Sequence, residues 1–230
     1  MRIHQHPSPN HGDRKGHRPR YVILHHTAMM SAEAALERLS DPEPEVSAHY
    51  LIGEDGTTWQ LVDEARRAWH AGRSFWQGET DLNSLSIGIE LANPGPLTGN
   101  PPFSEPQMQA LETLLRGIQA RWDITPRGVL GHSDIAIGRK TDPGDKFDWA
   151  RLARVGLAQA MPNGSIGVAP GEFEDCLAAI GYDPAADPAA RLQAFRLRWR
   201  CGPVPSKPDD WDRHVAALLA GDLQSNPTTV

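Results

Sequence analysis

The chain has 230 residues, a formal net charge of −6 and 39% hydrophobic residues. This length can bury the core of one sizeable domain and of a smaller second one. The acidic balance argues against a general nucleic-acid binder, which needs a basic surface, and no stretch approaches the roughly 20 apolar residues of a membrane span. The N-terminal residues lack the apolar segment of a signal peptide. We therefore expect a cytoplasmic protein with no nucleic-acid or membrane partner, and the sequence leaves its oligomeric state open.

The first half of the chain predicts short strands and one short helix. The polar residues 1–19 are expected to form a flexible N-terminal arm. The apolar run 21–24 predicts a buried strand, and residues 31–39 predict a helix that ends before a cluster of proline and acidic residues. In residues 49–62, two β-rich runs flank Asp55-Gly56, which is typical of a hairpin turn.

Strand and helix patterns continue to alternate up to about residue 160. Residues 85–91 predict a central strand that carries Glu90 near its end. Ser104 and Gln107 form a capping-box pattern at the start of a helix that reaches residue 122. A further strand is expected at 128–131, and a helix from Asp148 to Leu157. This alternation predicts an α/β fold for residues 20–160, with a mixed central β-sheet flanked by helices.

The last third of the chain predicts a small helical unit. Residues 161–169 are typical of a linker, and helical patterns follow at about 170–180, 188–200 and 208–220. Each helix is too short to be stable alone, so we expect a separate three-helix domain over residues 170–222 and a disordered tail at 223–230. Cys176 and Cys201 are too few for a disulfide framework, which favours two buried thiols over a disulfide without excluding the bond.

Three polar residues lie at the ends of predicted strands, where the ligand sites of α/β sheets gather. These residues are His25, Glu90 and His132. In residues 131–144, which read GHSDIAIGRKTDPG, Asp142 follows ten positions after His132, and Lys140 lies between them. Histidine and aspartate are zinc ligands, and catalytic zinc has three protein ligands. Spacing alone leaves both a zinc site and ordinary hydrogen-bonded histidines open.

Five stretches together resemble the type 2 N-acetylmuramoyl-L-alanine amidases, a family related to phage amidase lysozymes and peptidoglycan recognition proteins. They occur in the order VILHHTA (22–28), SAHYLIGEDGTTWQLVDE (47–64), AWHAG (68–72), SIGIELAN (86–93) and GHSDIAIGRKTDPG (131–144). The resemblance covers about residues 20–158. It implies a zinc hydrolase that cuts the amide between the lactyl group of N-acetylmuramic acid and L-alanine of the stem peptide.

The resemblance also implies a metal centre with one zinc ion. His25, His132 and Asp142 match the three zinc ligands of the family. The doubled histidine leaves a choice between His25 and His26, since neighbouring side chains of a strand point to opposite faces and only one can easily face the metal. The motif favours His25.

Other residues take catalytic or binding roles by the same resemblance. Glu90 matches the catalytic glutamate, which acts as a general base and then protonates the leaving amine. Lys140 matches the lysine that stabilises the developing oxyanion. His70, Trp69 and Asn93 are expected to bind substrate, and for His70 the alternative of orienting a metal ligand through a hydrogen bond stays open. His49 is either a structural histidine or a residue that orients a ligand or touches substrate.

The resemblance implies peptidoglycan fragments as the substrate and a role in cell-wall recycling, on 1,6-anhydro-muropeptides. Three alternatives stay open: a non-catalytic peptidoglycan-recognition module, an envelope or lytic amidase that acts on intact peptidoglycan, and a zinc amidase with a different acyl donor. Residues 171–184 and 191–200 weakly resemble a three-helix peptidoglycan-binding domain, although the segment that follows them departs from its pattern. Residues 20–160 are expected to form the zinc site without this domain.

Overall fold

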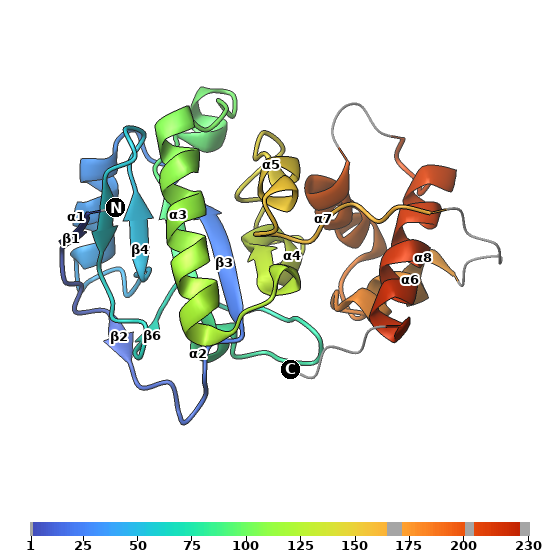
Figure 1. Cartoon of the computed structure of the whole chain (residues 1–230), viewed down its shortest axis with the longest axis horizontal. Helices are drawn as coiled ribbons and strands as arrows, with labels where there is room; N and C mark the ends of the chain where they lie inside the picture. The colour runs from blue at the N-terminus through green and yellow to red at the C-terminus, as the bar shows by residue number, and fades with distance from the viewer. Residues whose placement is uncertain (1, 165–171, 201–204, 226–230) are drawn as a thin grey trace.

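A computed structural model describes residues 2–164, 172–200 and 205–225 of the chain (Figure 1). Its centre is a six-stranded sheet with four neighbouring parallel strands and one antiparallel hairpin. In spatial order the strands are β1 (Ile3–Gln5), β5 (Thr58–Gln60), β4 (Tyr50–Ile52), β7 (Ser86–Leu91), β3 (Tyr21–His26) and β8 (Val129–Gly131). β2 (His11–Gly12) and β6 (Arg67–Ala68) form a separate antiparallel pair.

Helices cover both faces of the sheet, which confirms the predicted α/β class. The α-helices are α1 (Ala32–Ser40), α2 (Leu82–Leu85), α3 (Glu105–Trp122), α4 (His132–Ile135), α5 (Trp149–Arg154), α6 (Phe173–Ile180), α7 (Pro188–Trp199) and α8 (Asp210–Ser225). Short 3₁₀ turns lie at Gly95–Thr98 and Pro126–Gly128. The hairpin at Asp55-Gly56 forms as predicted between β4 and β5, and Gly56 has the positive φ of +85° that favours glycine.

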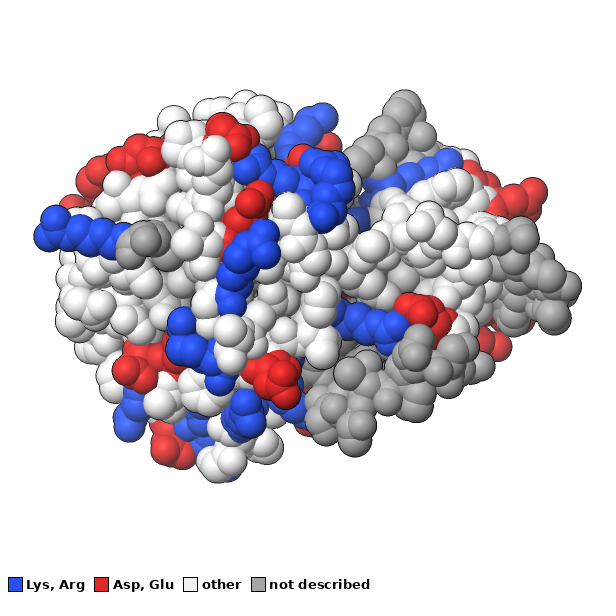
Figure 2. Space-filling view, viewed as in Figure 1, with Lys and Arg blue, Asp and Glu red and all other residues white. Residues whose placement is uncertain are grey.

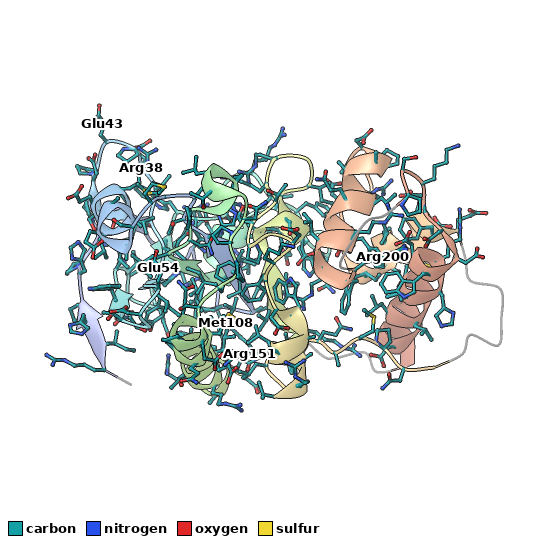
Figure 3. All side chains as sticks on the ribbon, turned by 90° about the horizontal axis from the view of Figure 1, so that it is seen from above. Arg38, Glu43, Glu54, Met108, Arg151 and Arg200 are labelled. Atoms are coloured by element: carbon teal, nitrogen blue, oxygen red, sulfur yellow. The ribbon has the colours of Figure 1, made fainter. Side chains whose placement is uncertain are left out.

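One face of the sheet packs against α3, whose apolar stripe follows the helical period. Met108, Leu111 and Leu115 join Val22 and Leu24 of β3 in this core. Ser104 caps the helix, because its Oγ accepts the backbone N–H of Gln107 at 3.3 Å. From α5, Arg151 pairs with Glu105 and Glu112 of α3, and Figure 3 shows Met108 and Arg151 on these neighbouring helices.

The opposite face packs against the C-terminal helices. Tyr21 and Ile23 of β3 share one hydrophobic core with Phe195 of α7 and Leu219 of α8. In addition, the buried Tyr182 hydroxyl donates to Asp134 Oδ1 of α4 at 3.0 Å. Figure 1 shows α6 and α8 at one end of the molecule, with α7 between them and the sheet.

The three predicted C-terminal helices are therefore present, and the separate three-helix domain over residues 170–222 stays a prediction. Their apolar stripes do not close on one another alone. They also cover the sheet face that carries Tyr21 and Ile23. Periodicity shows that a helix has an apolar face, but it does not show which surface that face covers, and this is why the sequence suggested an independent unit.

The N-terminal segment is packed against the rest of the chain, in contrast to the flexible arm that the sequence predicted. β1 pairs with β5, and Ser8, Asn10 and Arg14 are buried. The Asn10 amide donates to the Asp41 and Val46 carbonyls at 2.7 and 2.8 Å. Arg14 donates to two further backbone carbonyls at 2.8 Å. A polar segment can be buried when its donors meet backbone acceptors, which hydropathy does not reveal.

The remaining boundary predictions fall at the limits of the described residues. α8 extends to Ser225, three residues into the predicted tail 223–230, and residues 226–230 lie outside the described part of the chain. Residues 161–164 of the predicted linker form no helix or strand, and residues 165–169 are not described. Cys176 is buried among the C-terminal helices, and Cys201 lies outside the described residues. Among the described residues, no helix combines the length and apolar character needed to cross a bilayer.

Candidate active site and metal centre

Three buried side chains converge at the ends of β3 and β8. His25 ends the buried part of β3, His132 begins α4 directly after β8, and Asp142 lies in the loop that follows α4. His25 Nδ1 lies 3.0 Å from His132 Nδ1 and 3.1 Å from Asp142 Oδ2, and His132 Nδ1 lies 3.0 Å from the same oxygen. The structure thus brings together the three residues that the sequence predicted as metal ligands.

Hydrogen bonds on the outer side of each imidazole determine which nitrogen faces this centre. His132 Nε2 lies 3.1 Å from the Ala71 carbonyl, which can only accept, so Nε2 carries the proton. His25 Nε2 lies 3.0 Å from His70 Nδ1. Burial and the neighbouring His132 lower the pKa of His25 to about 4, so the ring is neutral at pH 7.

The two Nδ1 lone pairs and the Asp142 carboxylate therefore face one another, an arrangement that a divalent cation would stabilise. Nitrogen and oxygen ligands at about 2.0–2.2 Å from a tetrahedral zinc ion lie roughly 3.3–3.6 Å from each other. The separations of 3.0–3.1 Å between the three atoms are a few tenths of an ångström shorter than that spacing, so small side-chain shifts would bring them to it. The donor set and its spacing fit a metal ion with three protein ligands.

The doubled histidine is resolved by the alternation of β3. His25 shares a face with Tyr21 and Ile23, whereas His26 follows on the other side of the strand. The His26 ring packs on Gly95, where an added Cβ would lie 2.8 Å from His26 Cε1. His26 is therefore absent from the cluster of ligand atoms.

Glu90 lies on the strand next to His25, at the paired position of β7. Burial, reinforced by the negative charge of Asp142, raises the pKa of Glu90 to about 8, although Lys140 acts in the opposite direction. Glu90 Oε2 is buried and has no hydrogen-bond partner among the described residues. A carboxylate in such surroundings is suited to transferring protons, since its pKa is close to neutral pH.

A cleft of about 740 Å³ opens over these residues. One wall comes from α1, with Arg38 and Leu39, and the opposite wall comes from α7, with Gln193 and Leu197. Residues 138–142 form a further part of its lining. Figure 3 shows Arg38 on α1, toward the opposite end of the molecule from Arg200. A cleft of this size can hold a substrate of several sugar or amino-acid residues.

The other predicted site residues fall into two groups. Lys140, Trp69 and His70 line the cleft, so their predicted roles remain compatible with the structure. Asn93 is not among the described lining residues. Its amide donates to the Pro101 carbonyl at 3.1 Å and accepts the Gly95 N–H at 2.8 Å. The Asn93 side chain thus holds the loop after β7, and its predicted role in substrate binding stays a prediction.

The sequence did not reveal several residues of the site. Arg139 lines the cleft, and its guanidinium donates to the Ala71 and Arg73 carbonyls at 2.6 and 2.8 Å. The wall from α7 was also missed, because it comes from a segment that was expected to form a separate domain. Arg139 lies beside Lys140 in the motif at residues 131–144. This position in the motif was the only signal in the sequence that could have pointed to Arg139.

Charges of both signs are mixed over the face shown in Figure 2. Lysine and arginine side chains alternate there with aspartate and glutamate, and the net charge of the chain is −6. A nucleic-acid-binding surface would gather one sign of charge along a stripe or patch. This face offers no such stripe.

Comparison with known proteins agrees with this geometry. The family described as N-acetylmuramoyl-L-alanine amidase matches residues 15–145. The amidase AmiD of Escherichia coli is 37% identical over 211 residues, which are 80% of this chain and 75% of that protein. The 1,6-anhydro-N-acetylmuramyl-L-alanine amidase AmpD of Enterobacter cloacae is 34% identical over 64% of this chain and 86% of its own length.

Solved structures extend the likeness over nearly the whole chain. The structure of AmpDh3 from Pseudomonas aeruginosa has a TM-score of 0.79 at 32% identity and covers 94% of both chains. A structure of Escherichia coli AmiD, in complex with the substrate anhydro-N-acetylmuramic acid-L-Ala-D-γ-Glu-L-Lys, has a TM-score of 0.78 at 33% identity and covers 91% of both. The fold and site are those of an amide hydrolase. The chain belongs to the N-acetylmuramoyl-L-alanine amidase family.

Proposed function

We propose that this protein uses a zinc ion, held by His25, His132 and Asp142, to hydrolyse the amide between N-acetylmuramic acid and L-alanine in peptidoglycan fragments. The observation that carries the proposal is the convergence of two imidazole nitrogens and one carboxylate oxygen within 3.1 Å of each other, beside Glu90 in an open cleft. When bound, zinc polarises the scissile carbonyl, activates water and offsets the negative charge of Asp142.

Glu90 is proposed as the residue that moves the proton. Its carboxylate accepts a proton from the attacking water and delivers it to the nitrogen of the leaving L-alanine. Its raised pKa favours the second step, because a carboxyl group that holds its proton near neutral pH is an effective acid. Lys140 lies on the rim of the same cleft, and its ammonium group supplies positive charge for the oxyanion that forms at the carbonyl.

The proposed substrate is a 1,6-anhydro-muropeptide, in a cell-wall recycling role. Two relatives support this choice, since AmpD carries the anhydro-sugar in its name and AmiD was solved with an anhydro-muropeptide. A cytoplasmic location belongs to the same proposal. The wall contributed by α7 favours a second candidate, an amidase that acts on intact peptidoglycan, because this wall adds lining residues to the cleft for contact with a larger substrate.

The test measures zinc content and peptide release together, with an anhydro-muropeptide and intact sacculi as parallel substrates. We expect one zinc per chain and release of free peptide that a chelator abolishes and added zinc restores. Faster release from sacculi would replace the recycling role with the second candidate. Binding of muropeptide without any release of peptide would refute the enzyme and leave the recognition module.

Glu90→Gln separates catalysis from metal binding. We expect this variant to keep its zinc and to lose about 100-fold or more in kcat, because its amide cannot accept the proton. Glu33→Gln on the exposed face of α1 is the matched control and should keep the wild-type rate. Wild-type turnover in Glu90→Gln would contradict the role proposed for Glu90.

A further inference from the structure

The AWHAG segment supports both histidines of the proposed metal centre from behind. Its His70 contacts His25, and the carbonyl of its Ala71 contacts His132. The backbone N–H groups of His70 and Ala71 donate to Asn83 Oδ1, at 3.0 and 2.8 Å, and these bonds fix the segment against α2. One short loop therefore holds the outer nitrogen of each imidazole.

A chain of hydrogen bonds with a single direction runs through His70. The Ser86 hydroxyl donates to the Leu82 carbonyl at 2.5 Å, so its oxygen is left to accept from His70 Nε2, at 3.3 Å. His70 Nε2 then carries the proton and Nδ1 holds a lone pair. That lone pair accepts from His25 Nε2 at 3.0 Å, which places the bare Nδ1 of His25 toward His132 and Asp142.

The backbone of β7 makes room for this ring. A Cβ added to Gly88 would lie 2.4 Å from Cγ of His70, closer than real atoms approach. The His70 ring therefore occupies the place of a side chain at position 88, between Ser86 and Glu90 on one face of the strand. The ring stands edge-on to His25, with an interplanar angle of 80°.

We propose that His70 is a positioning residue that, through Ser86, fixes the tautomer and orientation of the metal ligand His25. This inference rests on the proposed function and replaces the expectation that His70 binds substrate. Both ring nitrogens of His70 are already engaged within the protein, so only carbon atoms of the ring remain for the cleft. Outer partners of this kind raise the basicity of a ligating imidazole and reduce its freedom to rotate.

The principal variants change the hydrogen-bond acceptor of His25 Nε2, which is Nδ1 of His70. His70→Leu removes this acceptor, and we expect zinc affinity to fall by about 10–100-fold, as for other outer partners of metal ligands. His70→Asn returns an oxygen near the position of Nδ1 and should recover part of that loss. Ser86→Ala removes the anchor of His70 and should weaken zinc binding less than His70→Leu does.

Ser8→Ala is the matched control, because Ser8 is likewise a buried serine whose hydroxyl donates to a backbone carbonyl, that of Leu39. We expect it to keep wild-type zinc affinity. Zinc affinity is measured by competition with a chromophoric chelator, and the absorption spectrum of the Co²⁺-substituted protein reports the coordination geometry. Both readouts are independent of amide hydrolysis. Far-UV circular dichroism shows whether each variant is folded.

Kinetics separate positioning from substrate contact. Positioning predicts a lower kcat at saturating zinc, an altered Co²⁺ spectrum and a KM within about twofold of the wild type. Wild-type zinc affinity and an unchanged spectrum in His70→Leu, with a raised KM, would overturn the inference and restore substrate contact. If His70→Leu does not fold, wild-type affinity and spectrum in both His70→Asn and Ser86→Ala would overturn it as well. Failure of the wild type to bind zinc would instead refute the proposed function.

Discussion

The shared core under the C-terminal helices predicts that the metal site and these helices unfold together. Phe195 of α7 is fully buried, and its ring contacts those of Phe173 and Tyr182 at centroid distances of 5.6 and 6.5 Å. Truncation of a buried phenylalanine to alanine costs about 3–5 kcal/mol, from lost burial and from the cavity that remains. At a urea dependence of roughly 2–3 kcal/mol per molar, Phe195→Ala should lower the unfolding midpoint by about 1–2 M.

The assay follows urea unfolding with two probes, far-UV circular dichroism for the whole chain and release of bound zinc for the metal site. Because the sheet residues Tyr21 and Ile23 lie in the same core as Phe195, we expect both probes to show one transition that shifts by the same amount. Leu115→Ala, on the opposite face of the sheet, should shift both probes in the same way. Val155→Ala, at an exposed side chain, should shift neither.

Independent unfolding of the helices would refute this reasoning. In that case Phe195→Ala would move only one of two phases in circular dichroism, and zinc release would stay at the wild-type urea concentration. A chain that ends at residue 164 gives a second check. It would expose the apolar face now covered by α6, α7 and α8, so we expect it to aggregate or to bind zinc weakly. A folded fragment with wild-type zinc affinity would restore the two-domain interpretation.

Three further predictions concern single side chains. Asp142→Asn removes the only anionic ligand of the proposed set and should weaken zinc binding more than the roughly 10–100-fold caused by loss of an outer partner, as chelator competition would show. Burial lowers the pKa of His49 to about 3, so between about pH 6.5 and pH 3 the unfolded chain binds a proton at this residue and the folded chain does not. The free energy of unfolding should therefore fall as the pH is lowered through this range, by up to roughly 1.4 kcal/mol per pH unit. The urea midpoint of His49→Gln should depend less on pH than the midpoint of His4→Gln, a control at an exposed histidine. Asn10→Ala leaves two backbone carbonyls without their donor and should cost about 1–3 kcal/mol in urea unfolding, whereas a wild-type midpoint would mean that the N-terminal segment contributes no stability.

Local patterns in the sequence predicted most of the elements of the fold, whereas the metal ligands were predicted from the family resemblance, because spacing alone left the zinc site open. The strand at 86–91, the hairpin at Asp55-Gly56 and the three C-terminal helices were predictable, because each depends on periodicity or turn chemistry within a few residues. The docked N-terminal segment and the α7 wall were not. Both depend on contacts between distant segments, such as Arg14 with the Ser84 carbonyl, and hydropathy carries no signal for them.

The β7 strand shows how one short motif combines folding with chemistry. Its residues Ile87, Ile89 and Leu91 face α3 and build the core, while Ser86, Gly88 and Glu90 face the cleft side. From the sequence, the small residues at 86 and 88 read only as part of a buried strand. In the structure Ser86 anchors His70, Gly88 leaves space for its ring, and Glu90 stands beside His25 in the register of β3. The strand that supplies the proposed general base Glu90 thus also positions His70, the hydrogen-bond partner of the proposed ligand His25. Substitutions at Ser86 or Gly88 should therefore impair metal binding before they impair the fold.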